Sequence, residues 1–383
     1  MNRSAQLPNL TTPQVDPQLR AEEFAEKNAR IAALLDRLQL SALWIRRNEN
    51  IAWATAGQVE ARVAIPLETA VASLLVTRDG RKYYLTTNNE ADRLASEEFE
   101  GLGYEPVVRP WYEDGTLDAV YRLAGNKAVG TDSDAPGFTT VDLAPLRAPL
   151  TAAEVDRFRW LAQHTAEATA ETLHALEPGM TENAMSAAVA AALLEQGILP
   201  TVLLMAADDR IFKYKHAVSR NGVLEHYGML NLCARKWGLA VSITRFVYFG
   251  QPPQQLVDGF AACAQVNAKL LHASRSGVTA AKLFAVAQQA YQEAGFAGEE
   301  NLHHQGGTAG YLEREWVATP QGKQALSATE ALAWNPSIRG AKTEDTALLQ
   351  NNAIEVLTLT PSLPEIITRV DGIDYPAANL LIR

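Results

Sequence analysis

Two polar side chains interrupt two neighbouring apolar runs near the middle of the chain. Asn231 lies in the run 229–234, Ser242 lies in the run 239–249, and the segment 235–238, which ends in glycine, connects the two runs. Apolar runs joined by a short glycine-containing turn predict a β-hairpin, whose paired strands can hold both side chains in one neighbourhood. The pattern therefore predicts a polar site on an apolar hairpin.

Residues suited to proton transfer and to anion binding lie before and after this hairpin. His216 precedes it in a lysine-rich stretch, and its imidazole suits acid–base catalysis because its unperturbed pKa lies near neutrality. Arg314 follows it, and a guanidinium group can bind a carboxylate through two parallel hydrogen bonds. Two alternatives stay open, namely an ordinary surface histidine and an exposed ion pair of Arg314 with Glu313 or Glu315.

The composition is that of a globular protein with one large or two ordinary domains. The 383 residues are 47% hydrophobic and 20% charged, and the formal net charge is −10. Such a charge argues against nucleic-acid and membrane partners, which require basic patches. No apolar run approaches the length of a membrane span or of a signal peptide, so we expect a cytoplasmic protein.

The pattern of apolar residues divides the chain into an arm and two domains. Residues 1–18 are proline-rich and predict a flexible arm, residues 19–150 alternate between helical and strand patterns, and residues 151–383 form the second domain. Within the first domain we expect a helix over 20–38 and strands over 40–45, 70–76 and 82–86. Thr151 and Glu154 form a capping box that starts the second domain with a long helix.

An internal repeat indicates that the second domain is duplicated. The segments 173–175 and 271–273 share the sequence Leu-His-Ala, and each is followed at the same distances by a glycine, a threonine and a further glycine. The constant offset between the copies is 98 residues, and an apolar helix lies within each copy. Duplication of a helix-helix-sheet unit favours a site in the cleft between the two copies.

The hairpin resembles the metal-binding hairpin of the pita-bread superfamily, peptidase family M24, which includes methionine aminopeptidase, aminopeptidase P, prolidase and creatinase. In its metallopeptidases two aspartates lie eleven residues apart and a Thr-Arg pair follows, which matches Asn231, Ser242 and Thr244-Arg245 here. The resemblance covers about nine-tenths of the chain. It implies an α+β protein with an amino-terminal creatinase-like α/β domain and a pita-bread catalytic domain.

The same resemblance implies that most metal ligands are missing. The family's five ligands are Asp, Asp, His, Glu and Glu, and the matching residues are Asn231, Ser242, His303 or His304, Asn335 and Glu344. Three carboxylates are thus replaced by neutral side chains. Hard divalent cations prefer carboxylate oxygens, and a two-metal site needs several of them, so we expect no metal and no other cofactor.

Creatinase has the most similar site pattern, because it lacks metals and cleaves a C–N bond of a small guanidino compound. Its catalytic histidine precedes the hairpin at a position similar to His216, and its carboxylate-binding arginine aligns with Arg314. Its guanidinium-binding glutamate is replaced by Thr244 here, which argues against creatine as the substrate. The resemblance also implies a homodimer, in which Arg62 of the first domain reaches the partner's site.

We therefore predict a metal-independent hydrolase or lyase that cleaves a C–N bond of a small, polar, carboxylate-bearing substrate. The expected catalytic residues are His216, Glu344 and His303, and the expected substrate-binding residues are Asn231, Ser242, Asn335, Arg314, His304 and Arg62. Two alternatives remain: an Xaa-Pro metallopeptidase with an atypical site, and a catalytically inactive pita-bread binding module.

Overall fold

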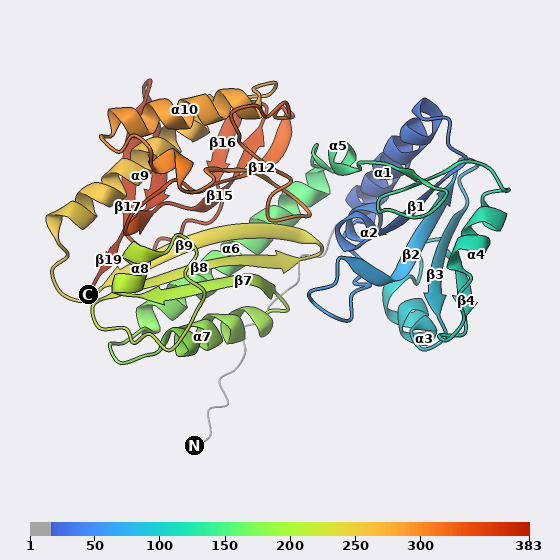
Figure 1. Ribbon diagram of the computed structural model, residues 1–383, viewed down its shortest axis with the longest axis horizontal. Coiled ribbons are helices and arrows are strands. Elements are labelled where there is room, and N and C mark those ends of the chain that lie inside the picture. The colour runs from blue at the N-terminus through green and yellow to red at the C-terminus, as the bar shows by residue number, and fades with distance from the viewer. Residues whose placement is uncertain (1–16) are drawn as a thin grey trace, which may run out of the picture. The chain divides into compact units, whose positions relative to one another are not determined.

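A computed structural model describes residues 17–383 and divides them into two compact units (Figure 1). The amino-terminal unit holds residues 17–154 and 237–239, and the carboxy-terminal unit holds residues 155–236 and 240–383. Residues 1–16 of the expected arm lie outside the described part, and the first helix begins at Pro17. No helix within the described residues is long and apolar enough to cross a membrane.

The amino-terminal unit is a mixed six-stranded sheet with the strand order β4-β3-β2-β1-β5-β6. Its elements are α1 (Pro17–Arg37), β1 (Ala42–Arg47), α2 (Asn48–Ala54), β2 (Thr69–Thr77), β3 (Lys82–Thr87), α3 (Ala91–Arg93), the π-helix η1 (Leu94–Glu98), β4 (Glu105–Arg109), α4 (Thr116–Leu123), β5 (Val129–Thr131), β6 (Thr139–Thr140) and α5 (Ala144–Arg147). The four elements expected in this domain therefore exist within a few residues of their expected bounds.

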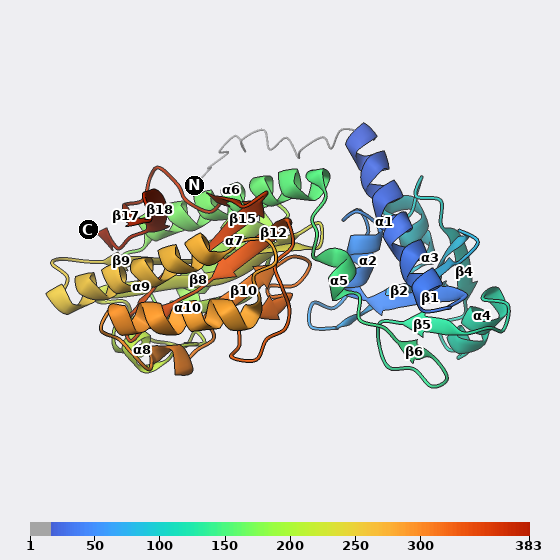
Figure 2. The same ribbon diagram turned by 90° about the horizontal axis from the view of Figure 1, so that it is seen from above.

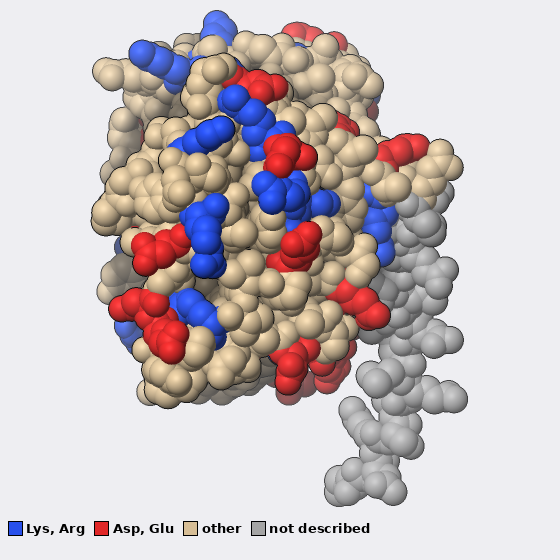
Figure 3. All heavy atoms as spheres, turned by 90° about the vertical axis from the view of Figure 1, so that its right-hand side faces the viewer, with Lys and Arg blue, Asp and Glu red and all other residues tan. Residues whose placement is uncertain are grey.

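Alternation along β1 explains how both faces of this sheet are covered. Trp44 packs in one cluster with Val120 of α4 and with Ala124, the residue that follows this helix, whereas its neighbours Leu43 and Ile45 are fully buried and point to the opposite face. Helix α1 lies on that opposite face (Figure 1). Figure 3 shows one face of this unit, where basic and acidic side chains are interspersed and neither sign of charge dominates.

The carboxy-terminal unit contains two larger sheets, with the strand orders β19-β9-β8-β7 and β11-β10-β12-β15-β16. Its helices are α6 (Ala152–Ala175), α7 (Glu182–Leu194), α8 (Asp209–Lys213), α9 (Gln254–Ala273), α10 (Ala280–Glu293) and the 3-10 turn η2 (Glu299–Asn301). Its strands are β7 (Leu199–Ala207), β8 (Tyr227–Lys236), β9 (Leu239–Tyr248), β10 (Gly306–Ala309), β11 (Trp316–Val317), β12 (Thr329–Trp334), β13 (Ser337–Ile338), β14 (Ala341–Lys342), β15 (Asp345–Gln350), β16 (Ala353–Val356), β17 (Glu365–Val370), β18 (Ile373–Ala378) and β19 (Leu381–Ile382).

The expected duplication is visible as two matching helix pairs, α6 with α7 and α9 with α10, the second pair lying side by side in both views (Figures 1 and 2). Thr181 caps α7 and Thr279 caps α10, with backbone φ angles of −82° and −83°. Each hydroxyl accepts a hydrogen bond from the amide three residues later, at 3.2 Å and 3.3 Å. The two copies therefore begin their second helix in the same way.

The capping box at the start of α6 is also present. The Thr151 amide donates to the Glu154 carboxylate at 2.7 Å, and the Glu154 amide donates to the Thr151 hydroxyl at 3.3 Å. Both residues are buried, so this reciprocal pair satisfies helix-end amides that water cannot reach. The sequence pattern thus locates the beginning of α6 to within one residue.

A buried ion pair joins the end of β9 to the start of β15. Arg245 donates to the Asp345 carboxylate at 2.6 Å and to the Thr358 carbonyl at 2.7 Å, and both charged side chains are at most 3% exposed. Arg245 also donates to the carbonyl of Glu344 at 3.3 Å. The pair therefore fixes the backbone of Glu344 against the hairpin.

We predict that Arg245→Ala lowers the free energy of unfolding by about 3–5 kcal/mol, because Asp345 would keep a buried charge without a cation. Urea unfolding followed by circular dichroism measures the change. The matched control is Arg159→Ala, which breaks the exposed pair with Glu355 at 2.8 Å and should cost less than about 1 kcal/mol. Equal losses in both variants would contradict the structural role of the buried pair.

Candidate active site

The expected hairpin forms from β8 and β9, with a two-residue turn instead of the four-residue turn expected from the sequence. Trp237 and Gly238 make the turn with φ angles of 53° and 78°, a left-handed pair that matches the twist of the flanking strands. Arg235 and Lys236 extend β8. Asn231 and Ser242 are both buried on these strands, 6% and 0% exposed, which agrees with a polar site on an apolar hairpin.

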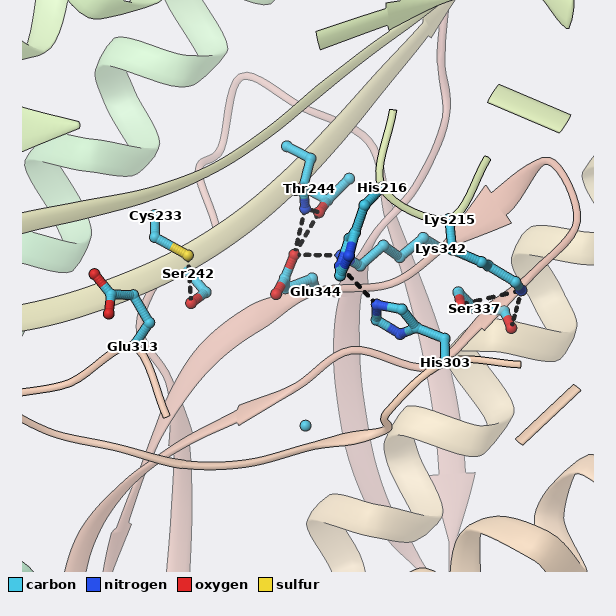
Figure 4. A network of polar contacts seen from close by, with 12 residues as sticks. Lys215, His216, Cys233, Ser242, Thr244, His303, Glu313, Ser337, Lys342 and Glu344 are labelled. Carbon is cyan, nitrogen blue, oxygen red and sulfur yellow. Dashed lines mark hydrogen bonds and ion pairs between the residues drawn. The ribbon is translucent and has the colours of Figure 1, made fainter. Parts of the chain in front are cut away.

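The carboxylate of Glu344 lies at the centre of a polar network on this hairpin (Figure 4). Its Oε2 atom accepts hydrogen bonds from Asn231 and Thr244, both at 2.6 Å, and pairs with the ammonium group of Lys342 at 2.8 Å. Its Oε1 atom pairs with Arg314 at 2.8 Å. Glu344 is 3% exposed, so these four groups replace the water that an ionised carboxylate needs.

The two cations keep the buried carboxylate ionised. Burial opposes the charged form of Glu344, but the charges of Lys342 and Arg314 outweigh burial and hold the pKa of this carboxyl well below its usual range. Glu344 is therefore an acceptor at neutral pH, and it is unsuited to donating a proton.

Arg314 connects Glu344 to the second hairpin position. Its Nη1 donates to the Ser242 hydroxyl at 2.7 Å, and its Nη2 donates to Glu344. The alternative of an exposed pair with Glu313 or Glu315 is wrong, because Glu313 pairs with Arg235 and Glu315 accepts from the Tyr311 amide. The Nε atom of Arg314 is buried and has no hydrogen-bond partner among the described residues.

Three imidazoles gather beside this network. The Nε2 atoms of His216 and His303 lie 2.9 Å apart, and one nitrogen from each of His216, His303 and His304 lies within 4.8 Å of the others. Burial and then the charge of Lys342 lower the pKa of His216 and lower that of His303 to about 2. Burial and then Arg314 lower the pKa of His304 to about 4. All three rings are therefore neutral at pH 7.

The structure brings together eight of the nine expected site residues in the carboxy-terminal unit, and in several of them a polar group has no partner. The Asn335 side-chain oxygen and the His303 Nδ1 atom are buried without a hydrogen-bond partner in the described part of the chain. Arg62 belongs to the amino-terminal unit, where its Nε lies 3.6 Å from the Glu60 carboxylate. Its expected role across a dimer stays a prediction.

Sequence reasoning missed Lys342 and the role of Thr244. Lys342 is 8% exposed and lies two residues before Glu344, so their side chains share one side of an extended segment. The spacing of Lys342 two residues before Glu344 is the signal that could have indicated a partner for the glutamate. The sequence indicates Thr244 as part of the matching Thr-Arg pair and as the residue that replaces a glutamate, whereas in the structure its hydroxyl binds the carboxylate of Glu344 directly.

The residues present do not fit a two-metal centre. Only one of the five matching positions is a carboxylate, and both of its oxygens are paired with cationic side chains. Ser242, at another of these positions, accepts from Arg314, and Asn231 donates its amide protons to Thr244 and Glu344. A pair of divalent cations would meet one negative and two positive charges, an arrangement opposite to what hard metal ions require.

We predict that Lys342→Met raises the pKa of Glu344, because it removes the cation that lowers this pKa most while burial continues to raise it. In the natural chain the depressed pKa gives stability that is present above about pH 4.3 and is lost only as the pH falls through the lower folded value. During acidification, the variant should therefore begin to lose stability at a higher pH than the natural chain does. Melting temperature against pH tests this, with the exposed Lys213→Met as control; parallel curves for both variants would contradict it.

Two family models match the chain, one over its amino-terminal part and one over its carboxy-terminal part. The model of metallopeptidase family M24 matches residues 156–351, and the creatinase/prolidase N-terminal domain model matches residues 28–158. A protein of Staphylococcus aureus strain MW2 described as an uncharacterized peptidase is 22% identical over 86% of this chain and 98% of its own length. The relative's name indicates a peptidase and specifies no substrate.

Solved structures share the fold at low sequence identity. The dipeptidase PepE of Mycobacterium ulcerans has a TM-score of 0.74 and 19% identity, covering 94% of this chain and 98% of its own. The Xaa-Pro dipeptidase of Bacillus anthracis has a TM-score of 0.72 and 16% identity, covering 94% and 100%. The chain therefore belongs to metallopeptidase family M24, the pita-bread superfamily, and carries a creatinase/prolidase amino-terminal domain before its catalytic domain.

Proposed function

We propose that the chain is a metal-independent hydrolase or lyase that cleaves a C–N bond of a small, polar, carboxylate-bearing substrate. The charge balance around Glu344 is the observation that carries the proposal. Lys342 and Arg314 supply two positive charges against the one negative charge of the carboxylate they share. The neutral imidazoles leave one positive charge in excess, which favours an anionic ligand and opposes a further cation.

His216 is suited to the role of acid–base catalyst. Its lowered pKa makes the neutral ring, a proton acceptor, the main form at pH 7. In a hydrolysis His216 would take a proton from water while the water oxygen bonds to the substrate carbon, and it would return that proton to the departing nitrogen. In an elimination the same ring would instead remove a proton from the carbon next to the C–N bond, a C=C bond would form as the C–N bond breaks, and the ring would return the proton to the departing nitrogen.

His303 and Asn335 would position the reacting groups. One of the two facing Nε2 atoms of His216 and His303 carries a proton and donates a hydrogen bond, and the other atom accepts this hydrogen bond. His303 would thereby orient the ring of His216. The unpaired oxygen of Asn335 can accept a hydrogen bond from a substrate N–H group. We also propose that the enzyme is a homodimer in which Arg62 of one subunit contributes to the other's site.

A single-metal peptidase acting on Xaa-Pro substrates is the second candidate. The grouping of His216, His303 and His304 favours it, because three neutral imidazoles with an open fourth position can hold a Zn²⁺ ion. The names of the similar proteins also favour peptidase activity. The ammonium group of Lys342, which faces the same rings, opposes it.

Metal content separates the two candidates. Elemental analysis of the purified protein, before and after exposure to Zn²⁺ and Mn²⁺, should find far less than one tightly bound ion per chain, and Xaa-Pro dipeptides should stay intact. About one ion per chain that is lost in His304→Ala, together with dipeptide cleavage, would support the peptidase and overturn the first candidate.

We predict that His216→Ala lowers turnover of the substrate by about two to four orders of magnitude, because the variant lacks the ring that is proposed to move the proton. The exposed His226→Ala is the matched control and should keep turnover within about twofold, since it removes a histidine outside the network. In the natural enzyme, the acidic limb of the pH–rate profile should have its midpoint at a pH below about 6.5, the ordinary pKa of histidine. Equal activity of the two variants would remove His216 from the mechanism.

A further inference from the structure

A cavity of about 380 Å³ lies within the amino-terminal unit, separate from the catalytic residues. Its floor is the sheet face formed by β1, β2 and β3, with Trp44, Ser73 and Leu85 among the lining residues. The first turn of α4 and the segment 134–136 complete its walls. This volume is at the small end of the range found for sites that bind small molecules.

Two arginines line this cavity without a carboxylate partner. Arg46 donates to the backbone carbonyl of Asp134 at 3.3 Å, and Arg109 donates to the backbone carbonyl of Glu113. Within the described residues neither guanidinium forms an ion pair, so carbonyl groups orient the two side chains and leave both charges uncompensated. Most other arginines of this unit, such as Arg81 and Arg93, are paired with carboxylates.

Trp44 holds one of the two guanidinium groups in place. The Arg46 guanidinium carbon lies 4.5 Å from the centre of the indole ring, and the ring packs against Phe138 at 5.2 Å. The Trp44 Nε1 atom donates to the Ser73 hydroxyl at 2.9 Å, which fixes the ring. Arg46 is thus preorganised, and a ligand would bind it at a lower cost in side-chain entropy.

The remaining charges at the cavity leave a positive balance. Asp134 is the acidic residue in the lining, and its carboxylate accepts from the Thr140 hydroxyl at 3.1 Å. Helix α4 begins at Thr116 in the wall of the cavity, and no side chain caps it, which adds the partial positive charge of a helix N-terminus. Among the lining residues the two guanidinium groups outnumber the one carboxylate, while Asp118 in the first turn of α4, outside the lining, offsets the partial charge of the helix end.

We propose that this cavity binds a small organic anion through carboxylate or phosphate groups, with Arg46 of β1 and Arg109 of β4 as donors from two different strands that line it. Guanidinium groups bind carboxylates and phosphates in the same way, through parallel hydrogen bonds, so the two arginines can recognise either kind of anion. Leu85 and Leu117 line the same cavity and provide contact for an apolar part of the ligand. The site is independent of the catalytic function proposed for the other unit.

Isothermal titration calorimetry on the full chain tests the proposal with three probes: inorganic phosphate, citrate and adenosine 5′-monophosphate. At least one should bind with a dissociation constant below about 1 mM, and the neutral adenosine should not bind at this concentration. The probe that binds distinguishes a phosphate from a carboxylate ligand. The resonance of the Trp44 indole N–H should shift during the titration, which locates binding at the cavity.

Arg46→Gln and Arg109→Gln should each weaken binding by about tenfold or more, because each removes a charge-assisted contact. The matched control is Arg37→Gln, an exposed arginine of α1 outside the cavity lining, which should change binding by less than about twofold. Circular dichroism checks that the variants fold. Absence of binding of all three anions at about 10 mM, or unchanged binding in both cavity variants, would overturn the proposal.

Discussion

The carboxylate of Glu344 is the group on which the site depends, because a buried negative charge requires compensation from within the chain. Lys342 and Arg314 provide it as full charges, and Asn231 and Thr244 provide it as hydrogen bonds. This one requirement accounts for the close approach of β9, β15 and the loop that carries Arg314. It also explains why the site differs from a metal centre on the same fold: the positive charges are covalently part of the protein.

Local chemistry made much of the fold predictable from the sequence. Thr151 with Glu154 located the start of α6, and the recurrence at an offset of 98 residues indicated the duplicated helices. These signals depend on neighbours within a few residues or on direct self-similarity. The hairpin turn was placed too broadly, because Trp237 adopts a left-handed conformation that few side chains adopt and that a sequence pattern does not reveal.

The site was predictable where the family pattern supplied a position and not where a partner had to be identified. The pattern named Glu344, Arg314 and His303, but it could not indicate that the arginine binds Ser242 and the glutamate at once. Lys342 was missed because its importance comes from an ion pair within an extended segment, and a lysine two residues from a glutamate is most often exposed. Pairings of this kind depend on tertiary geometry, which residue types and spacing leave undetermined.

The duplicated architecture distributes the site unevenly between its two ancestral halves. The first copy contributes His216, Asn231, Ser242 and Thr244, all of which are neutral at pH 7, whereas Arg314, Lys342 and Glu344 all come from the second copy. The charged part of the site can thus evolve within one half while the other half keeps its polar scaffold. Separate expression of the halves would divide the three charged side chains from Asn231, Ser242 and Thr244, so a working site requires their reassociation.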